Sequence, residues 1–309
     1  MNFQQLDYAL AVNKEQHFGL AAESCNITQA TLSAMIKKLE EELGYFLFDR
    51  SHKPVKTTEK GIRFMELARS IINQQAEMKL LSNQTETLEG KLTLGIIPTV
   101  ANSLLPIILT TILKDNPKLE LEISEITTEE IKKQLIADKI DLGILATPLK
   151  EPLLQEHVLY YEPMMVYGVK EKNKSYVSSE DIKGGNVWLL EEGHCFRSQA
   201  LVICEIKEKE IGLNNLKFRG NSFETLLNLS DSFGGYTLLP ELYFNTMDEN
   251  KKSITKHFKK PIPVREISIV SYRPHTHTEA INYLTDLIQN AVLLSSYKLK
   301  NNEMDVIGF

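Results

Sequence analysis

AAESCNITQATLS, residues 21–33, is the stretch that decides the fold of the amino-terminal part of this chain. It predicts the end of one helix, a tight turn at Cys25-Asn26-Ile27, and the start of a further helix that the Thr28 hydroxyl can cap. Gly44 is a natural stop for that helix. Apolar residues at helical spacing mark this helix and the first one of the chain: Phe3, Leu6 and Leu10, then Leu32, Ile36, Leu39 and Leu43. The sequence therefore predicts the order helix, helix, turn, helix.

A candidate wing follows Gly44. Two short strands are predicted over residues 46–50 and 55–57, on either side of a turn at 51–54. The stretch from Arg50 to Arg63 holds five basic residues and one acid. The net charge of the whole chain is −6, but a local basic patch is what attracts a phosphate backbone. We therefore expect the wing to contact DNA phosphates.

The outer face of the predicted third helix is suited to reading DNA. The second helix of a helix-turn-helix enters the major groove, so its outward side chains must be short donors and acceptors or bases. The alternative is a generic helical bundle whose polar face is only solvated, and the adjoining basic wing favours the DNA interface. The candidates for DNA contacts are Thr28, Gln29, Thr31, Ser33 and Lys37 on the helix, with Arg50 and Lys53 on the wing.

A long helix is predicted from Thr58 to about Leu88. It contains no proline, and Gly61 is its only glycine. A helix of about 30 residues is about 45 Å long, which is more than a bundle of this size can cover. One stripe runs along it through Phe64, Ala68, Ile71, Gln75, Met78 and Leu81. We expect this helix to pair with a second copy of the chain.

Strands alternate with helices after Gly90, which is typical of a parallel sheet with crossover helices. The expected strands lie at 92–97, 119–123 and 141–146, and the expected helices at 102–114 and 128–137. Further strands at 164–168, 187–190, 236–239 and 267–272 allow two lobes, and a final helix at 278–295 would pack on the first lobe. The expected domains are a winged helix-turn-helix at 1–58, a linker and dimerisation helix at 59–89, and a two-lobed α/β regulatory domain at 90–309, with a second lobe at about 163–267.

Length and composition indicate a multidomain globular protein. With 309 residues, 42% of them hydrophobic and 25% charged, the chain exceeds a single domain of ~100 to 200 residues. No apolar run approaches the ~20 residues that span a bilayer, and the first residues lack a secretory signal, so we expect a cytoplasmic protein without membrane contact. The three cysteines, at 25, 195 and 204, are too few for a disulfide scaffold, and a disulfide in that compartment would be a switch.

Cys195 and Cys204 form the second informative pattern. Cys195 follows a predicted strand and lies near a helix amino terminus, with His194 and Arg197 close by, and a helix dipole and a cation both stabilise thiolate. Buried structural thiols and a zinc site are alternatives, although a second closely spaced ligand pair for zinc is missing. We expect no metal and no cofactor. Nine helical residues separate two Cα atoms by ~13 Å, whereas a disulfide needs ~4.4 to 6.8 Å, so the segment must refold if these cysteines bond.

The amino-terminal motifs together have a specific pattern. They are residues 21–33, Ile36-Lys37-Lys38-Leu39-Glu40, Leu43-Gly44, Leu47-Phe48-Asp49-Arg50 and Thr57-Thr58-Glu59-Lys60-Gly61. This pattern resembles the helix-turn-helix and wing of LysR-type transcriptional regulators. Ala30 stands where that family usually has proline. The resemblance implies a regulator that binds double-stranded promoter DNA and a regulatory domain like the periplasmic binding proteins.

Motifs of the regulatory half carry a closer resemblance. They are Gly95-Ile96-Ile97-Pro98-Thr99-Val100, Leu104-Leu105-Pro106, Gly193-His194-Cys195 to Cys204, Ser222-Phe223-Glu224-Thr225-Leu226, Thr237-Leu238-Leu239-Pro240 and Tyr272-Arg273-Pro274. With them, nearly the whole chain resembles the OxyR subfamily of LysR-type regulators. The resemblance implies a bacterial, nucleoid-associated sensor of hydrogen peroxide that activates oxidative-stress genes and is not an enzyme.

The resemblance also assigns roles to residues. Cys195 would be the peroxidatic cysteine and Cys204 the resolving one, while Thr99 and Thr128, or the adjacent Thr127, would hold peroxide. The remaining expected members of the sensing site are His194, Arg197 and Arg273.

The implied assembly is a homotetramer, a dimer of dimers, that also contacts RNA polymerase. Two positions depart from the subfamily: Ser198 replaces an aspartate and Lys217 a histidine. Two other functions stay open, namely a LysR-type regulator of a small metabolite held between the lobes, and a thiol peroxidase that carries a DNA-binding domain.

Overall fold

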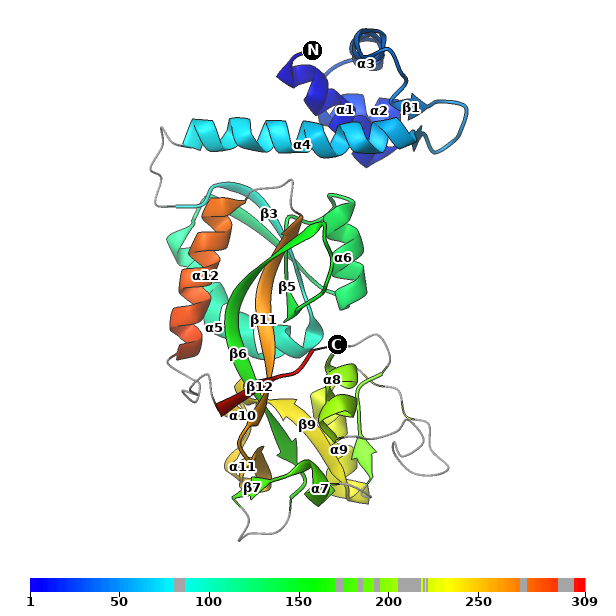
Figure 1. Cartoon of the computed structure of the whole chain (residues 1–309). Helices are drawn as coiled ribbons and strands as arrows, with labels where there is room; N and C mark the ends of the chain where they lie inside the picture. Colours follow the sequence, from blue (N-terminus) through cyan, green and yellow to red (C-terminus); the bar gives the residue numbers. More distant parts are fainter. Residues whose placement is uncertain are drawn as a thin grey trace.

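The computed structural model describes residues 1–80, 87–169, 175–182, 186–191, 195–204, 218, 220, 222–272, 277–293 and 303–308. A small helical domain stands at one end of the molecule, a long helix follows it, and an α/β part with two lobes forms the rest (Figure 1). Three separate clusters of buried apolar side chains correspond to the helical domain and the two lobes. The predicted fold class is confirmed by this architecture.

The helical domain is a winged helix-turn-helix. Thr28 caps the third helix, since its hydroxyl accepts a hydrogen bond from the Thr31 N–H at 3.2 Å, and Gly44 ends that helix in the left-handed region at φ 74°. Leu32, Ile36 and Leu39 are fully buried beneath it. The elements are α1 (Phe3–Glu15), α2 (Phe18–Ser24), α3 (Gln29–Leu43), and the antiparallel wing strands β1 (Phe48–Asp49) and β2 (Lys56–Thr57).

The long helix α4 is described over Glu59–Leu80. Leu88 lies outside it, and the Leu88 N–H donates to the Asn116 side chain at 2.6 Å; residues 81–86 and the side chain of Met78 are outside the described part. Phe64 and Ala68 pack into the helical domain. Ile62, Leu67 and Ile71 are exposed apolar residues of the same helix, and of these three only Ile71 belongs to the predicted stripe.

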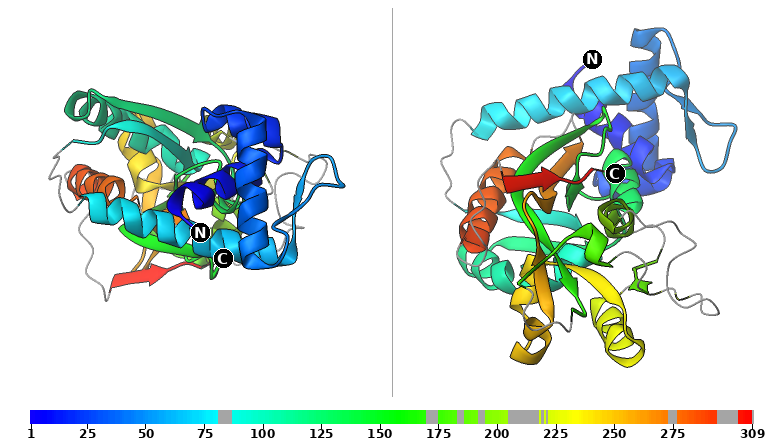
Figure 2. Two further views of the ribbon diagram at one scale, coloured as in Figure 1. Left: turned by 90° about the horizontal axis from the view of Figure 1, so that it is seen from above. Right: turned by 60° about the horizontal axis from the view of Figure 1, so that its bottom comes forward.

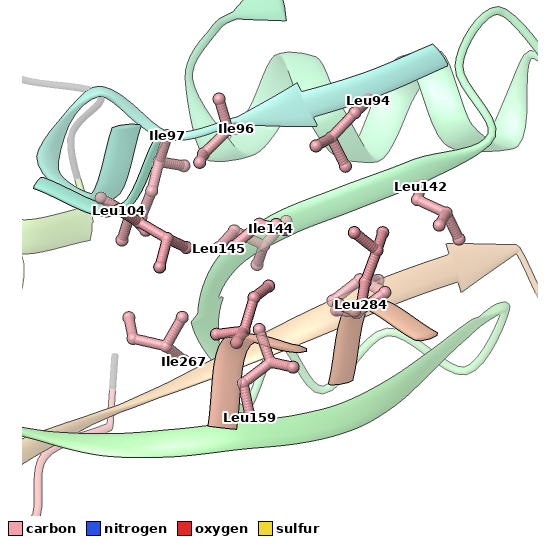
Figure 3. Packing of buried hydrophobic residues seen from close by; sticks show 14 of the residues in the cluster. Leu94, Ile96, Ile97, Leu104, Leu142, Ile144, Leu145, Leu159, Ile267 and Leu284 are labelled. Atoms are coloured by element: carbon pink, nitrogen blue, oxygen red, sulfur yellow. The ribbon is translucent and has the colours of Figure 1, made fainter. Parts of the chain in front are cut away.

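The first lobe contains the predicted alternation of strands and helices. Strands β4, β3 and β5 are parallel, but β11 and β6 continue the sheet in the antiparallel sense, so the sheet is mixed and not parallel throughout. Figure 3 shows side chains of β3, β5, β6, β11 and α12 pointing toward one another in this core. The elements are β3 (Gly90–Ile96), α5 (Pro98–Asp115), β4 (Leu119–Glu125), α6 (Thr128–Ile136), β5 (Leu142–Thr147), β6 (Leu154–Tyr167), β11 (Ile262–Tyr272) and α12 (Thr278–Leu293).

Strand β6 contributes residues to the buried clusters of both lobes, and β11 pairs with it in the antiparallel sense along most of its length (Figure 2). Strands β9 and β10 pair with the far end of β6 in the second lobe. None of the described helices has the length and apolar character of a membrane span. The elements of this lobe are β7 (Tyr176–Val177), α7 (Ser179–Ile182), β8 (Val187–Trp188), α8 (Cys195–Cys204), α9 (Phe223–Phe233), β9 (Tyr236–Pro240), α10 (Glu241–Asn245), α11 (Glu249–Ser253), β10 (Thr255–Phe258) and the C-terminal β12 (Met304–Val306).

Candidate functional site

Cys195 and Cys204 are the first and last residues of α8. Both are free thiols; Cys195 is half-buried and Cys204 is buried. Since α8 is one helix of ten residues, the two Cα atoms are about 13 Å apart, and a disulfide requires about 4.4 to 6.8 Å. The two cysteines therefore cannot bond while α8 is intact.

Two threonines from the first lobe belong to the surroundings of Cys195. Thr99 lies in the first turn of α5 and Thr128 is the first residue of α6, and both are buried. The Thr128 hydroxyl lies against the Cys195 thiol, yet among the described residues it has no hydrogen-bond partner of good geometry. Thr127 instead caps α6, because its hydroxyl accepts from the Glu130 N–H at 3.4 Å. Of the two adjacent threonines, Thr128 is the one that meets the cysteine.

Arg265 completes this cluster and was not among the residues expected from sequence. It lies on β11 and is fully buried. Its guanidinium donates to the Thr99 hydroxyl at 2.8 Å and to the Thr99 backbone oxygen at 2.9 Å, and its Nε donates to the Glu162 carboxylate at 2.7 Å. The guanidinium carbon also lies 5.3 Å from the ring centroid of Phe196, the residue after Cys195. Arg265 therefore connects α5, β6 and α8.

The electrostatic surroundings of Cys195 differ from those expected. Burial raises the pKa of its thiol, although the Thr128 hydroxyl, the Arg265 guanidinium and nearby backbone N–H groups each lower it. Arg197 does not supply the cation, because its guanidinium donates to the Leu190 backbone oxygen at 2.9 Å. The cation is Arg265, which is 70 positions further along the chain. His194, Arg273 and Lys217 lie outside the described residues.

A signal for Arg265 was present in the sequence. It is a charged residue in the mostly apolar strand Ile262–Tyr272, in which every residue except Glu266 is buried. A charge in a buried strand must be paired or hydrogen-bonded, since burying an isolated charge is very costly. Glu162 interrupts the apolar end of β6 in the same way and is 2% exposed. Pairing these two residues would have located a buried ion pair, but not its position beside Cys195.

Most of the residues expected to read DNA are exposed in the helical domain. Gln29, Thr31 and Lys37 are exposed on α3, and Lys53 is exposed on the wing turn. Ser33 is half-buried, and the exposed Thr28 shares a hydroxyl contact of 2.9 Å with Thr31.

Arg50 has a structural role that the sequence did not indicate. Its guanidinium donates to the buried Glu40 carboxylate at 2.9 Å and lies 4.8 Å from the ring centroid of Phe18. Glu40 also accepts from the backbone N–H groups of Leu47 and Phe48, at 2.8 and 3.2 Å. Glu40 and Arg50 therefore attach the wing to α3, and only the part of Arg50 that stays exposed can face a phosphate.

Comparison with known proteins agrees with this architecture. Residues 3–62 match the model of the bacterial regulatory helix-turn-helix protein, lysR family, and residues 85–292 match the LysR substrate binding domain. The chain is 36% identical over 278 residues to the "Hydrogen peroxide-inducible genes activator" of Pectobacterium carotovorum subsp. carotovorum, covering 89% of this chain and 91% of that protein.

Two further similarities extend over nearly the full length. The "DNA-binding transcriptional dual regulator OxyR" of Escherichia coli strain K12 is 36% identical over 279 residues, covering 89% of this chain and 90% of its own. A solved full-length OxyR variant from Pseudomonas aeruginosa superposes with a TM-score of 0.72 at 28% identity, covering 94% of this chain and 98% of that one. On its fold, its two matching family domains and these relatives, the chain belongs to the LysR family of DNA-binding transcriptional regulators and, within it, to the OxyR subfamily.

Proposed function

We propose that this regulator senses hydrogen peroxide through reversible formation of a disulfide between Cys195 and Cys204. The observation that carries the proposal is the placement of Cys195 beside Thr128 and Arg265, with Cys204 at the other end of the same helix. The Thr128 hydroxyl, whose described polar neighbour is the Cys195 thiol itself, can hydrogen-bond a small polar molecule. The relatives named as peroxide-inducible activators support this assignment.

The first chemical step is an attack by the Cys195 thiolate on one oxygen of hydrogen peroxide. An S–O bond forms, the O–O bond breaks, and hydroxide leaves and takes up a proton to become water. The sulfur is oxidised to sulfenic acid while peroxide is reduced. Arg265 stabilises the thiolate, and Thr99 and Thr128 are proposed to hold peroxide.

The second step requires α8 to open. Burial raises the pKa of the Cys204 thiol to about 12, so this thiol is a poor nucleophile inside the helix. Once α8 unwinds and Cys204 reaches water, its sulfur attacks the Cys195 sulfur. The S–S bond forms, the S–O bond breaks, and the hydroxyl leaves as water with the Cys204 proton. The refolded segment then changes subunit packing and the spacing of the DNA-reading helices.

The remaining parts of the proposal concern organisation and partners. We propose a DNA-binding domain at 1–58, a linker and dimerisation helix at 59–89 and a regulatory domain at 90–309, with a second lobe at about 163–267. The exposed apolar side chains of α4 support pairing with a second copy. We further propose that the protein assembles as a dimer of dimers, contacts RNA polymerase and is located in the cytoplasm. It would undergo one oxidation event per activation cycle, in place of enzymatic turnover.

A thiol-trapping assay on the purified full-length protein tests this function. Substoichiometric peroxide should give a Cys195 to Cys204 link by mass spectrometry of alkylated peptides, and Cys195→Ser should abolish both the link and the peroxide response of a promoter reporter. Cys25→Ser is the matched control, because Cys25 lies in the DNA-binding domain. A normal reporter response in Cys195→Ser would remove the sensing role and favour a regulator of a small metabolite.

A further inference from the structure

The last described residues of the chain lie against the redox-active helix. Strand β12 pairs in parallel with β11, Met304 opposite Ile262 and Val306 opposite Val264. The Ile307 N–H then donates to the Val264 backbone oxygen at 2.9 Å, next to the sensing arginine. In Figure 1 the chain continues from β12 toward α8. Residues 303–308 are called the C-terminal strap below.

One side chain of α8 holds this strap directly. Gln199 lies in the middle of α8 and is fully buried. Its side-chain N–H donates to the Ile307 backbone oxygen at 3.0 Å, across 108 positions of sequence. A buried amide without a partner is costly, so this hydrogen bond favours the state in which α8 and the strap are both in place.

The apolar contact beside this hydrogen bond is small. Ile307 is buried in the same cluster as Ile203 and Cys204. An open pocket of about 340 Å³ is lined by Val202 and Ile203 of α8, by Asp305 and Ile307 of the strap, and for the larger part by second-lobe residues within 177–179 and 258–263. Ile307 and the Gln199 hydrogen bond connect the strap to α8, whereas β12 and an ion pair of 2.6 Å between Lys260 and Glu303 hold the strap on the neighbouring strand β11. A contact of this size can be released and remade without unfolding the lobe.

We propose that the C-terminal strap, acting through the positioning residue Gln199, sets how readily α8 unwinds after Cys195 is oxidised. The inference rests on the proposed function, because it concerns the second step of that chemistry. Bringing Cys204 to Cys195 requires the turns between them to unwind, and Gln199 lies in those turns. The strap stabilises the helical state and therefore slows condensation of the sulfenic acid with Cys204.

The test uses full-length protein and separates the two chemical steps. Gln199→Leu removes the hydrogen bond at similar side-chain volume, and a chain that ends after residue 302 removes the strap. Ser198→Ala is the matched control, since Ser198 is the exposed neighbour on the same helix. The first step is followed in a Cys204→Ser background with a sulfenic-acid probe, and the second by quenched alkylation of protein that carries Cys204.

Loss of one hydrogen bond corresponds to a change of about three- to tenfold, so the sulfenic acid of Gln199→Leu should condense faster by that factor. The truncated chain, which also loses the Ile307 contact, should condense at least as fast as Gln199→Leu. The first step should stay within twofold of wild type, because Cys195 begins α8 and does not contact the strap directly. Adding Gln199→Leu to the truncated chain should have no further effect, since the truncation already removes the acceptor of the Gln199 side chain. Ser198→Ala should behave as wild type.

Several results would overturn the inference. The inference is contradicted if the condensation rate of Gln199→Leu equals that of wild type, or if the rate of the first step changes by the same factor as the condensation rate. It is also contradicted if the effect of the double variant on the condensation rate is the product of the two single effects. If the truncated chain does not fold, Gln199→Leu and a second variant, Gln199→Met, decide the question by themselves. If wild-type protein forms no Cys195 to Cys204 link, the proposed function fails and the strap has no step to control; a normal link with unchanged variants rejects the strap alone.

Discussion

Replacing Arg265 by methionine should separate the structural and the chemical roles of the buried arginine. The substitution removes three hydrogen bonds, two to Thr99 and one to Glu162. It also leaves the Glu162 carboxylate, which is 2% exposed, with the Leu242 N–H at 3.2 Å as its remaining described donor. Breaking a buried ion pair by removing one partner lowers the free energy of unfolding by about 3 to 5 kcal/mol. We expect a loss of that size in urea unfolding.

The double variant Arg265→Met with Glu162→Gln removes the stranded charge while keeping an acceptor for the Leu242 N–H. It should recover about 2 kcal/mol or more of the loss, since replacing both partners of a buried pair is much less harmful than removing one. Its oxidation rate should not recover. Without Arg265 the pKa of the Cys195 thiol rises further, and each rise of one in pKa reduces the thiolate fraction at neutral pH about tenfold.

The assay is quenched thiol trapping at pH 7 in a Cys204→Ser background, beside urea unfolding of the same proteins. We expect the double variant to recover much of its free energy of unfolding while its oxidation rate stays at least about tenfold below that of wild type. A double variant that regains the normal oxidation rate would show that the arginine acts on Cys195 only through the fold. An Arg265→Met protein as stable as wild type would refute the ion-pair argument.

Three further predictions concern the same two sites. Because burial raises the pKa of Cys195, its oxidation rate should climb with pH from 6 to above 8; a flat stopped-flow profile over that range would contradict the raised pKa. Thr128→Val should slow oxidation with little change in melting temperature. Thr99→Val should slow oxidation and also lower the free energy of unfolding by about 1 kcal/mol or more, because only the Thr99 hydroxyl accepts a hydrogen bond from Arg265. Equal melting temperatures in the two variants would count against this difference. Lys53→Ala should reduce the salt slope of promoter binding by about one without changing stability, whereas Arg50→Ala should also destabilise the DNA-binding domain, because Arg50 pairs with Glu40. Fluorescence anisotropy at several salt concentrations measures the salt slope, and thermal unfolding measures the stability. An Arg50→Ala protein as stable as wild type would argue against the structural role of Arg50.

Local sequence signals determined the helical domain. The order helix, helix, turn, helix follows from hydrophobic spacing, the Thr28 cap and the Gly44 stop, and the structure confirms all three. These signals act between residues a few positions apart, so a single sequence contains them. The same holds for β3, α5, β4, α6 and β5, although α5 begins at Pro98 and not at Asn102. The separation of Cys195 from Cys204 was also predictable, because a helix has a fixed rise per residue.

Tertiary structure alone decided what surrounds the cysteines. The nearest cation in sequence, Arg197, binds a backbone oxygen, while the cation beside the thiol comes from β11. The pKa of Cys195 is raised and not lowered, because burial depends on how α8 packs between the lobes and outweighs the neighbouring charge. Likewise, β6 and β11 are antiparallel, and the strap returns to α8 from the far end of the chain. Contacts between residues tens to more than a hundred positions apart depend on strand pairing and on packing of separate elements, which local propensity and spacing do not specify.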